Sequence, residues 1–296
     1  MKRLFGIAVV ALALAAGGCA SAANSTKDAS ASSDGVRYDA ALHAKLPAPV
    51  RSRGEIRLLT APSYAPMEQL AADGQTIIGF EPDLASALGS VLGIKVVMVP
   101  GDFDTSLDNI SKGAYDGVLS SMNDTPEREK KADFLDYFQA GTSILVQRGN
   151  PRGITDLDDL CGQVVAVETG TVQDDLLRRS QRGCGGDKMV VKKFRSNVDA
   201  WLALRSGKAM AVLNDYPPAA YMAGDVKTRA YYQLASTVQY EPGLFGIALP
   251  KSNPQLRDAM RQALDRLIHS GAYNELLQRW NLIGGGLPAS SVNAGT

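Results

Sequence analysis

The chain has 296 residues, 45% of them apolar, and its 31 Lys and Arg residues balance 31 Asp and Glu residues to a formal net charge of zero. A balanced charge provides no overall field toward nucleic acid or an anionic surface, so we expect no nucleic-acid partner. The length allows one large or two modest domains, and the apolar content is that of an ordinary globular protein.

The N-terminal segment has the three parts of an export signal. Lys2 and Arg3 give a cationic start, residues 4–16 are almost wholly apolar, and small residues then lead to Cys19. The apolar run is shorter than the roughly 20 residues that a membrane-spanning helix needs. The segment resembles a bacterial lipoprotein signal, which predicts a signal peptide over 1–18 and lipidation of Cys19. An ordinary signal peptide with an incidental cysteine is the alternative.

The next stretch predicts a tether. Residues 20–36 are dominated by Ser, Ala, Asp and Asn without an apolar period, which is typical of a flexible segment. Residues 37–53 carry scattered apolar positions and two prolines, and they give no clear element. We therefore group 19–53 as a tether and N-terminal extension.

From Gly54 onward the pattern alternates between strands and helices. In the first half, the pattern predicts strands at 56–59, 77–80, 95–99 and 118–119 and helices at 84–92 and 104–112. Apolar residues of the first helix recur at i, i+4, i+7 and i+8, and Gly93 ends it. The alternation predicts an α/β fold with mostly parallel sheets.

The alternation repeats in the second half. We expect strands at 164–167, 190–191 and 209–213, and helices at 171–182, 197–206, 215–223, 254–269 and 271–280. Thr171, with Asp174 three residues later, is a variant of the capping box. Pro217 and Pro218 fall in the first turn of their helix, where a missing N–H costs little.

Cysteine usage predicts one disulfide and no metal site. Beyond Cys19, an exported chain has the even pair Cys161 and Cys184, which we expect to be bonded. The bond would close a loop of about 24 residues and add roughly 3 kcal/mol of stability. Two free buried thiols are the alternative. Two distant histidines and no Cys-x-x-Cys pattern predict no metal, and nothing suggests a cofactor.

An ordered set of short motifs is more specific than any of these elements. The set comprises PSYAP at 62–66, IGFEPDL at 78–84, KGAYDG at 112–117, SSMNDTPER at 120–128, DFLDYF at 133–138, TDL at 155–157, ETGT at 168–171, ND at 214–215 and GAY at 271–273. Together they resemble the family 3 solute-binding proteins of bacterial ABC importers, in the amino-acid group, over residues 54–282. The cysteine pair and the lipoprotein start resemble the actinobacterial branch.

The resemblance implies two α/β lobes, each a mostly parallel sheet flanked by helices, with a ligand cleft between them and two strand-like hinges. It places lobe 1 at 54–140 plus 244–285, lobe 2 at 141–243 and a C-terminal tail at 286–296. The crossings are expected near 139–142 and 240–245.

A free amino acid needs donors for its carboxylate. Arg128 resembles the carboxylate-binding arginine of the family, since its planar guanidinium can make two parallel charge-assisted bonds. The alternative is a solvated charge within its own helix. Backbone N–H groups at Asn123 and at Gly170, Thr171 and Val172 are expected to complete the cradle, because helix starts supply unpaired donors. Their alternative role is ordinary helix capping.

The ammonium group needs acceptors. Asp215, at the end of the strand at 209–213, resembles the ammonium-binding aspartate of the family, and Ser121 is expected to assist through its hydroxyl or carbonyl. The alternative for Asp215 is a helix N-cap, a role that Asn214 could take instead.

The pocket for the ligand's side chain is less specific. Tyr64 and Phe103 match positions of side-chain contacts in the family, although both could pack within a lobe. Ala61 stands where binders of basic amino acids tend to have an aspartate. Glu168 and Gln173 could hydrogen-bond a polar group, and Glu168 could also accept a cation. We therefore favour a polar or acidic amino acid.

The resemblance implies a function in uptake. It predicts a monomeric, non-enzymatic binding protein on the outer face of the cytoplasmic membrane, which captures a free amino acid and delivers it to an ABC permease. An exported dehydratase of a prephenate- or arogenate-like substrate on the same fold is the alternative, with Glu168 as its only candidate catalytic carboxylate.

Overall fold

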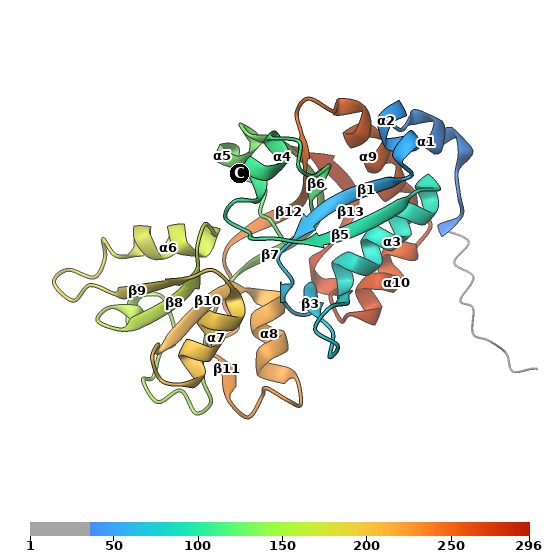
Figure 1. The fold of residues 1–296 in the computed structure, drawn as a ribbon. Coiled ribbons are helices and arrows are strands. Elements are labelled where there is room, and N and C mark those ends of the chain that lie inside the picture. The colour runs from blue at the N-terminus through green and yellow to red at the C-terminus, as the bar shows by residue number, and fades with distance from the viewer. Residues whose placement is uncertain (1–35) are drawn as a thin grey trace, which may run out of the picture. The chain divides into compact units, whose positions relative to one another are not determined.

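The computed structural model describes residues 36–296 (Figure 1). The predicted signal peptide, Cys19 and nearly all of the tether lie outside the described residues. Within 36–296, no helix combines the length and the apolar character that crossing a bilayer requires.

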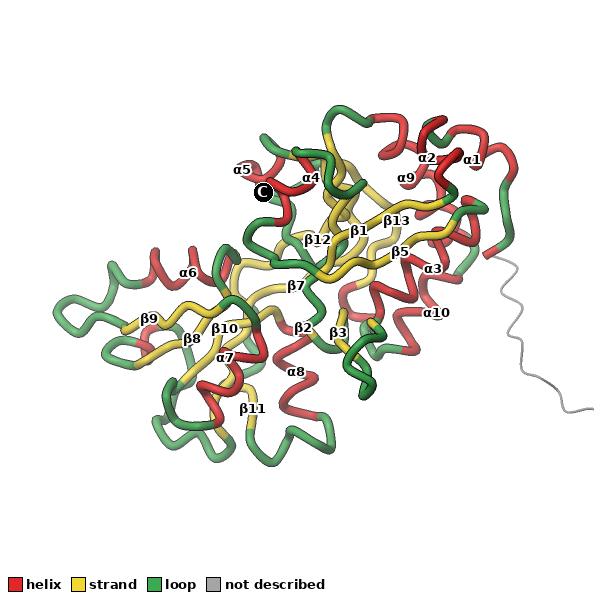
Figure 2. The backbone as a smooth tube through the Cα atoms, viewed as in Figure 1, coloured by secondary structure: helices red, strands yellow, loops and turns green. Residues whose placement is uncertain are grey.

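Two long antiparallel strands join two parallel sets in one sheet. They are β7 (Ala132–Gln147) and β12 (Tyr240–Pro250), and the strand order is β5-β1-β6-β12-β7-β10-β8-β9. The first parallel set is β5 (Lys95–Pro100), β1 (Glu55–Thr60) and β6 (Gly117–Val118), and the second is β10 (Ala211–Asp215), β8 (Val164–Glu168) and β9 (Val190–Phe194). In Figure 2 these strands form two groups, with β7 running between them. The predicted two-lobed α/β class is confirmed.

Lobe 1 buries its sheet under helices whose apolar stripes the sequence shows. They are α3 (Phe80–Leu92), α9 (Pro254–His269) and α10 (Ala272–Arg279). Gly93 ends α3 in the left-handed region at φ 61°, as expected of a C-terminal glycine. Two short helices, α4 (Ser106–Ser111) and α5 (Pro126–Glu129), lie near the ends of the strands (Figure 1).

The extension that precedes the first strand is helical. Residues 37–53, grouped with the tether in our prediction, contain α1 (Ala40–Lys45) and α2 (Ala48–Arg53). Leu42, Leu46 and Val50 are buried in the main core, so this segment is part of the globule. These residues, for which the sequence gives no clear element, form an N-terminal extension packed against the core.

Lobe 2 follows the predicted alternation closely. Its helices are α6 (Val172–Ser180), α7 (Asn197–Arg205) and α8 (Tyr216–Gly224), and the short strand β11 (Tyr232–Leu234) pairs with β7. The Thr171 hydroxyl accepts from the backbone N–H of Asp174, which confirms the predicted cap. β8 and β10 are parallel, so their last residues, Glu168 and Asp215, lie at the same edge of the sheet.

The C-terminal stretch is not simply a tail. Residues 286–292 form β13 (Gly286–Val292), which pairs with β7, whereas we expected all of 286–296 to lie beyond lobe 1. The expected crossings near 139–142 and 240–245 fall within β7 and β12, and the register of that pair shifts between Tyr240 and Gly243. The exact lobe boundaries stay predictions.

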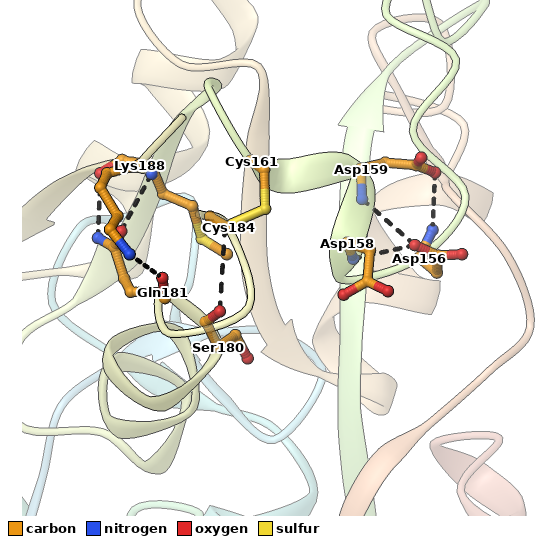
Figure 3. Close-up of a disulfide and its surroundings, with 9 residues drawn as sticks. Asp156, Asp158, Asp159, Cys161, Ser180, Gln181, Cys184 and Lys188 are labelled. Atoms are coloured by element: carbon orange, nitrogen blue, oxygen red, sulfur yellow. Dashed lines mark hydrogen bonds between the residues drawn. A yellow bond between two sulfur atoms is a disulfide. The ribbon is translucent and has the colours of Figure 1, made fainter. Parts of the chain in front are cut away.

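The predicted disulfide is confirmed. Cys161 and Cys184, 23 residues apart, are bonded, with their Cα atoms 5.2 Å apart. Figure 3 shows the bond joining the end of a one-turn 3₁₀ helix, η2 (Asp158–Leu160), to the segment after α6. Both cysteines pack against the apolar cluster of lobe 2, so the bond fixes the outer end of that lobe's core.

Candidate functional site

A small pocket is lined by residues of both lobes at the ends of their strands. Its lining contains eight of the eleven predicted ligand-binding residues: Tyr64, Phe103, Ser121, Asn123, Glu168, Thr171, Gln173 and Asp215. Ala61, Glu68 and Ser120 complete the lining. The remaining predicted residues, Arg128, Gly170 and Val172, line a larger adjoining cavity that shares Phe103 and Asn123 with the pocket.

Asp215 holds the N-cap position of α8 but does not act as a cap. Its side chain makes no capping hydrogen bond, and its carboxylate instead accepts from Tyr64 Oη at 2.7 Å and from Gln173 Nε2 at 2.9 Å. Burial raises the pKa of Asp215 to about 7, although these hydrogen bonds and the charge of Arg128 lower it. The capping alternative for this residue is therefore excluded, and a ligand cation would favour its charged form.

Asn214 is not the cap either, so that alternative is wrong. Its Oδ1 accepts from Trp201 Nε1 at 2.7 Å, and its Nδ2 donates to Asn197. Both ends of the side chain are thus used inside lobe 2, behind the pocket.

Gln173 has a different role from the one expected. Its Nε2 donates to Asp215 and, at 3.1 Å, to Thr142 Oγ1. The amide therefore orients the carboxylate of Asp215, and its predicted contact with a polar ligand side chain stays untested.

Arg128 connects the two sides of the cleft. Its Nη1 donates to the Asn123 carbonyl at 2.8 Å and its Nη2 donates to the Gly170 carbonyl at 3.0 Å. The guanidinium carbon lies 5.6 Å from the centre of the Phe103 ring, in the range of a cation–π contact. Burial lowers the pKa of Arg128 to about 10, while the charge of Asp215 raises it. The group stays charged at neutral pH, and two of its five N–H donors make these bonds.

The turn before α6 brings backbone close to this arginine. Gly170 has φ 78°, and a Cβ built there would lie 3.1 Å from Cβ of Asp104. Glycine therefore suits both the left-handed conformation and the close approach. Thr171 caps α6 and also lines the pocket, which joins the two roles proposed for it.

Glu168 ends β8 and faces the same pocket. It is only 5% exposed, its Oε2 accepts from Asn197 Nδ2, and its Oε1 is buried with no hydrogen-bond partner. Burial, with a smaller contribution from the charge of Asp104, raises the pKa of Glu168 to about 8. Near neutral pH this carboxyl therefore exists in both protonation states.

Two residues that we did not predict, Glu68 and Ser120, also line the pocket. The β2–β3 hairpin (Ser63–Tyr64 and Glu68–Leu70) sets Tyr64 directly opposite Glu68. Glu68 Oε1 accepts from Ser120 Oγ at 2.9 Å. Burial and the adjacent Glu81 raise the pKa of Glu68 well above its usual range. The position of Glu68 in the pocket depends on this pairing, which strands of only two and three residues do not signal in the sequence.

The hydroxyl of Ser121, which we expected to contact the ligand, already donates a hydrogen bond within the protein. Its hydroxyl and backbone N–H donate to Glu81 Oε1 at 2.8 Å and 2.7 Å, and its φ of 46° marks a left-handed turn. With its proton committed to Glu81, the hydroxyl can only accept from a further partner, which suits an ammonium group.

The pocket is rich in carboxyl groups. Three carboxyl groups, Glu68, Glu168 and Asp215, line it, and none of its lining residues is Lys or Arg. Within the described residues, no group of three or more His, Cys, Asp or Glu side chains has the geometry to hold a metal ion. Such a lining provides acceptors for the donors and positive charges of an organic ligand.

Comparison with known proteins identifies the class. A family model described as bacterial extracellular solute-binding proteins, family 3, matches residues 56–283. The arginine-binding protein ArgT of Corynebacterium glutamicum is 29% identical over 85% of this chain and 82% of its own length. The L-cystine-binding protein TcyJ of Escherichia coli K12 is 28% identical over 78% of this chain and 84% of its own length.

A solved structure agrees in fold. The ancestral amino-acid-binding protein AncCDT-1, described as a precursor of cyclohexadienyl dehydratase, is 30% identical and has a TM-score of 0.68. It covers 78% of this chain, which covers 97% of it. The fold and pocket define an extracellular solute-binding protein. The chain belongs to family 3 of the bacterial extracellular solute-binding proteins.

Proposed function

We propose that this protein captures a free amino acid in the cleft and holds it by its two charged ends. Asp215 and Ser121 accept from the ammonium group, and Arg128 with the backbone N–H groups near Asn123 and Thr171 donates to the carboxylate. One observation carries the proposal: Asp215 occupies a helix N-cap yet turns its carboxylate to the pocket. A buried carboxylate directed into a cleft serves a cation better than it serves the helix.

The proposed mechanism is closure of the two lobes around the ligand. Arg128 already donates to Gly170, and Tyr64 to Asp215, across the cleft. A ligand that contacts both sides binds the closed form more tightly than the open form and shifts the population toward it. The closed form is then delivered to an ABC permease in the membrane. Relatives whose names state binding of arginine or L-cystine support an amino acid as the ligand.

The location belongs to the same proposal. Cys19 carries the lipid that ties the protein to the outer face of the cytoplasmic membrane, after removal of 1–18, and the protein works there as a monomer. The lipoprotein-like signal and the class of the relatives support this placement. Mass spectrometry of the membrane fraction tests it: a diacylated N-terminal Cys19 is expected, and a mature protein beginning elsewhere without lipid contradicts it.

The pocket favours one of the two ligand types expected from the sequence. An acidic side chain would bring a further carboxylate to Glu68, Glu168 and Asp215, whereas a polar side chain that donates hydrogen bonds would satisfy them. We therefore propose a donor-bearing side chain and no longer favour an acidic one.

A binding screen tests the function directly. Thermal shifts of the mature protein are measured with each of the twenty amino acids, and any that stabilise it are titrated by calorimetry. A ligand at about 100 times its dissociation constant adds roughly 2.7 kcal/mol of stability, which such a screen detects. Saturable binding with one ligand per chain is expected, and no binding by any amino acid contradicts the proposal.

One observation is compatible with the alternative function, a dehydratase. Burial raises the pKa of Glu168 to about 8, which leaves a protonated carboxyl in the pocket at neutral pH. Such a group could act as a general acid. Incubation with prephenate and with arogenate tests this reading. We expect no product; product that disappears in Glu168→Gln would favour the enzyme.

A further inference from the structure

We propose that Glu168, together with Glu68, forms a second cation site in the pocket, so that the amino acid bound has a positively charged side chain. This inference rests on the proposed function, because it takes the ammonium group of the ligand to lie at Asp215. It extends that function by assigning the opposite, distal end of the ligand.

The first argument is that a chain of hydrogen bonds within lobe 2 fixes the orientation of the Glu168 carboxyl group. A chain of hydrogen bonds runs from Trp201 to Asn214, to Asn197 and then to Glu168 Oε2. An indole N–H can only donate, so each amide in the chain must accept on one side and donate on the next. Asn197 therefore presents its NH₂ group to Glu168, and Oε2 must accept.

The second argument is that the other oxygen of Glu168 lacks a partner. Oε1 is buried and makes no hydrogen bond with the protein, although Glu168 lines the pocket. Leaving a buried polar atom unsatisfied costs free energy, and for a charged group the cost is larger. A donor brought by the ligand would satisfy this oxygen without any rearrangement of the chain of amides.

The third argument concerns charge. Glu68 is 1% exposed and lines the same pocket as Glu168, and its pKa is raised first by burial, then by Glu81, with the charge of Glu168 as a smaller cause. The two side chains therefore act on one another, although they come from the β2–β3 hairpin and from β8. The nearby lysine, Lys193, is paired with Asp174 at 2.8 Å, and Arg128 is bound to Asn123 and Gly170. A ligand cation is the group that would relieve this repulsion.

The fourth argument is that the two acceptors have separate hydrogen-bond partners within the protein. Glu168 and Asp215 end neighbouring parallel strands, β8 and β10. Asp215 is already oriented by Tyr64 and Gln173, whereas Glu168 is oriented by Asn197. Two carboxylates with separate supports fit a ligand with two positive groups, and an amino acid with a neutral side chain has only one.

A matched pair of ligands tests the inference. L-arginine and L-citrulline have the same length and the same α-groups, and only arginine is charged at its distal end. Calorimetry of the mature protein at pH 8 is expected to give an affinity for arginine about 10- to 100-fold higher than for citrulline, the range of a hydrogen-bonded charge pair. L-lysine and L-norleucine repeat the comparison for an ammonium group.

Variants separate recognition from a structural role. Glu168→Gln is expected to weaken arginine about 10-fold or more and to leave citrulline within about threefold, because the amide keeps the shape and loses the charge. Equal losses for both ligands would assign Glu168 a structural role and overturn the proposal. Glu275→Gln, at an exposed position on α10, is the control and is expected to change neither affinity.

The outcomes distinguish a failure of the proposed cation site from a failure of the proposed amino-acid-binding function. If citrulline and norleucine bind as tightly as arginine and lysine, the cation site is wrong and the binding function stands. If no amino acid binds at all, the proposed function fails as well. If Glu168→Gln does not fold, Glu68→Gln replaces it in the same ligand comparison, and an unchanged arginine-to-citrulline ratio overturns the proposal.

Discussion

Tyr64 and Asp215, which lie 151 residues apart on opposite sides of the pocket, exchange two hydrogen bonds. The Tyr64 hydroxyl donates to Asp215 Oδ2 at 2.7 Å and accepts from the Asp215 backbone N–H at 2.9 Å. The buried tyrosine thus fixes both the carboxylate and the backbone N–H of Asp215, the residue directly before α8. This contact links the β2–β3 hairpin of lobe 1 to Asp215 of lobe 2.

Tyr64→Phe removes both bonds and keeps the ring. We expect the affinity for the amino acid to fall about 10-fold, since one lost hydrogen bond to a charged group costs about 1.5 kcal/mol or more. Without ligand, the variant is expected to populate more open lobes, seen as a larger radius of gyration in solution scattering. An unchanged affinity together with an unchanged scattering curve would contradict the role of this contact.

Arg128→Lys tests the carboxylate partner. Lysine keeps the charge but cannot present two parallel donors, so binding is expected to weaken at least about 10-fold while the melting temperature of the unliganded protein stays close to that of the parent. Calorimetry and thermal unfolding give the two readings. Arg261→Lys, on α9 and paired with Asp265 away from the pocket, is the matched control. A loss of less than about threefold in Arg128→Lys would remove this residue from the site.

The raised pKa values predict a dependence on pH. The pKa of Glu168 is about 8 and that of Asp215 about 7, and both are raised chiefly by burial. A cation binds the charged forms, so affinity for arginine should rise between pH 6 and pH 8. The ratio of arginine to citrulline affinity isolates Glu168, because Asp215 acts equally on both ligands.

Glu168 and Asp215 have the opposite effect on the stability of the unliganded protein: its free energy of unfolding should fall as pH rises. In the folded state these carboxyls keep their protons up to about pH 7 or 8, whereas in the unfolded chain they lose them near pH 4. The folded protein therefore binds more protons over this range, and its free energy of unfolding should fall as pH rises from about 4 to 8. Asp124, with a pKa raised to about 7, adds to this slope from outside the pocket. Chemical unfolding of the parent and of Glu168→Gln checks the sign, and a flatter slope in the variant is expected.

Reduction of the disulfide should destabilise lobe 2 without changing the ligand contacts. The bond closes a loop between residues 23 apart, and the chain-entropy relation gives roughly 3 kcal/mol for a loop of that length. The double variant Cys161→Ser/Cys184→Ser is therefore expected to unfold at lower denaturant concentration and, when folded, to bind with the parent's affinity. A loss of affinity without a loss of stability would mean that the bond shapes the pocket.

Elements with a strong local signal were predictable from the sequence. The apolar spacing of α3 and its terminal Gly93 define that helix, and Thr171 marks the start of α6 through its cap. In these cases the information lies within a few residues of the element itself.

Elements that depend on distant partners were not predictable in the same way. Residues on both faces of β7 are buried, so its pattern shows no alternation. The helices α1 and α2 have six residues each; α1 packs onto α3 and α9, and α2 packs onto β1. Helices of that length do not persist alone.

The residues of the site divide in the same way, into those with a local sequence signal and those whose positions depend on distant partners. Asp215 and Glu168 were predicted because they belong to two motifs of the family resemblance, ND and ETGT, which follow predicted strands. Glu68 was not, because its position in the pocket depends on pairing with Tyr64 across a hairpin of only two- and three-residue strands. The roles of Asn214 and Gln173 likewise depend on side-chain partners that no sequence pattern reveals.

One calorimetric comparison tests the central claim most directly: that Arg128 and Asp215 hold the two charged ends of a single amino acid. L-arginine is titrated beside agmatine, which lacks the carboxylate, and Nα-acetyl-L-arginine, which lacks the charged ammonium. We predict that each derivative binds about 100-fold more weakly than arginine, the effect of losing a charge-assisted pair in a buried site. Binding of either derivative within about threefold of arginine would contradict the account.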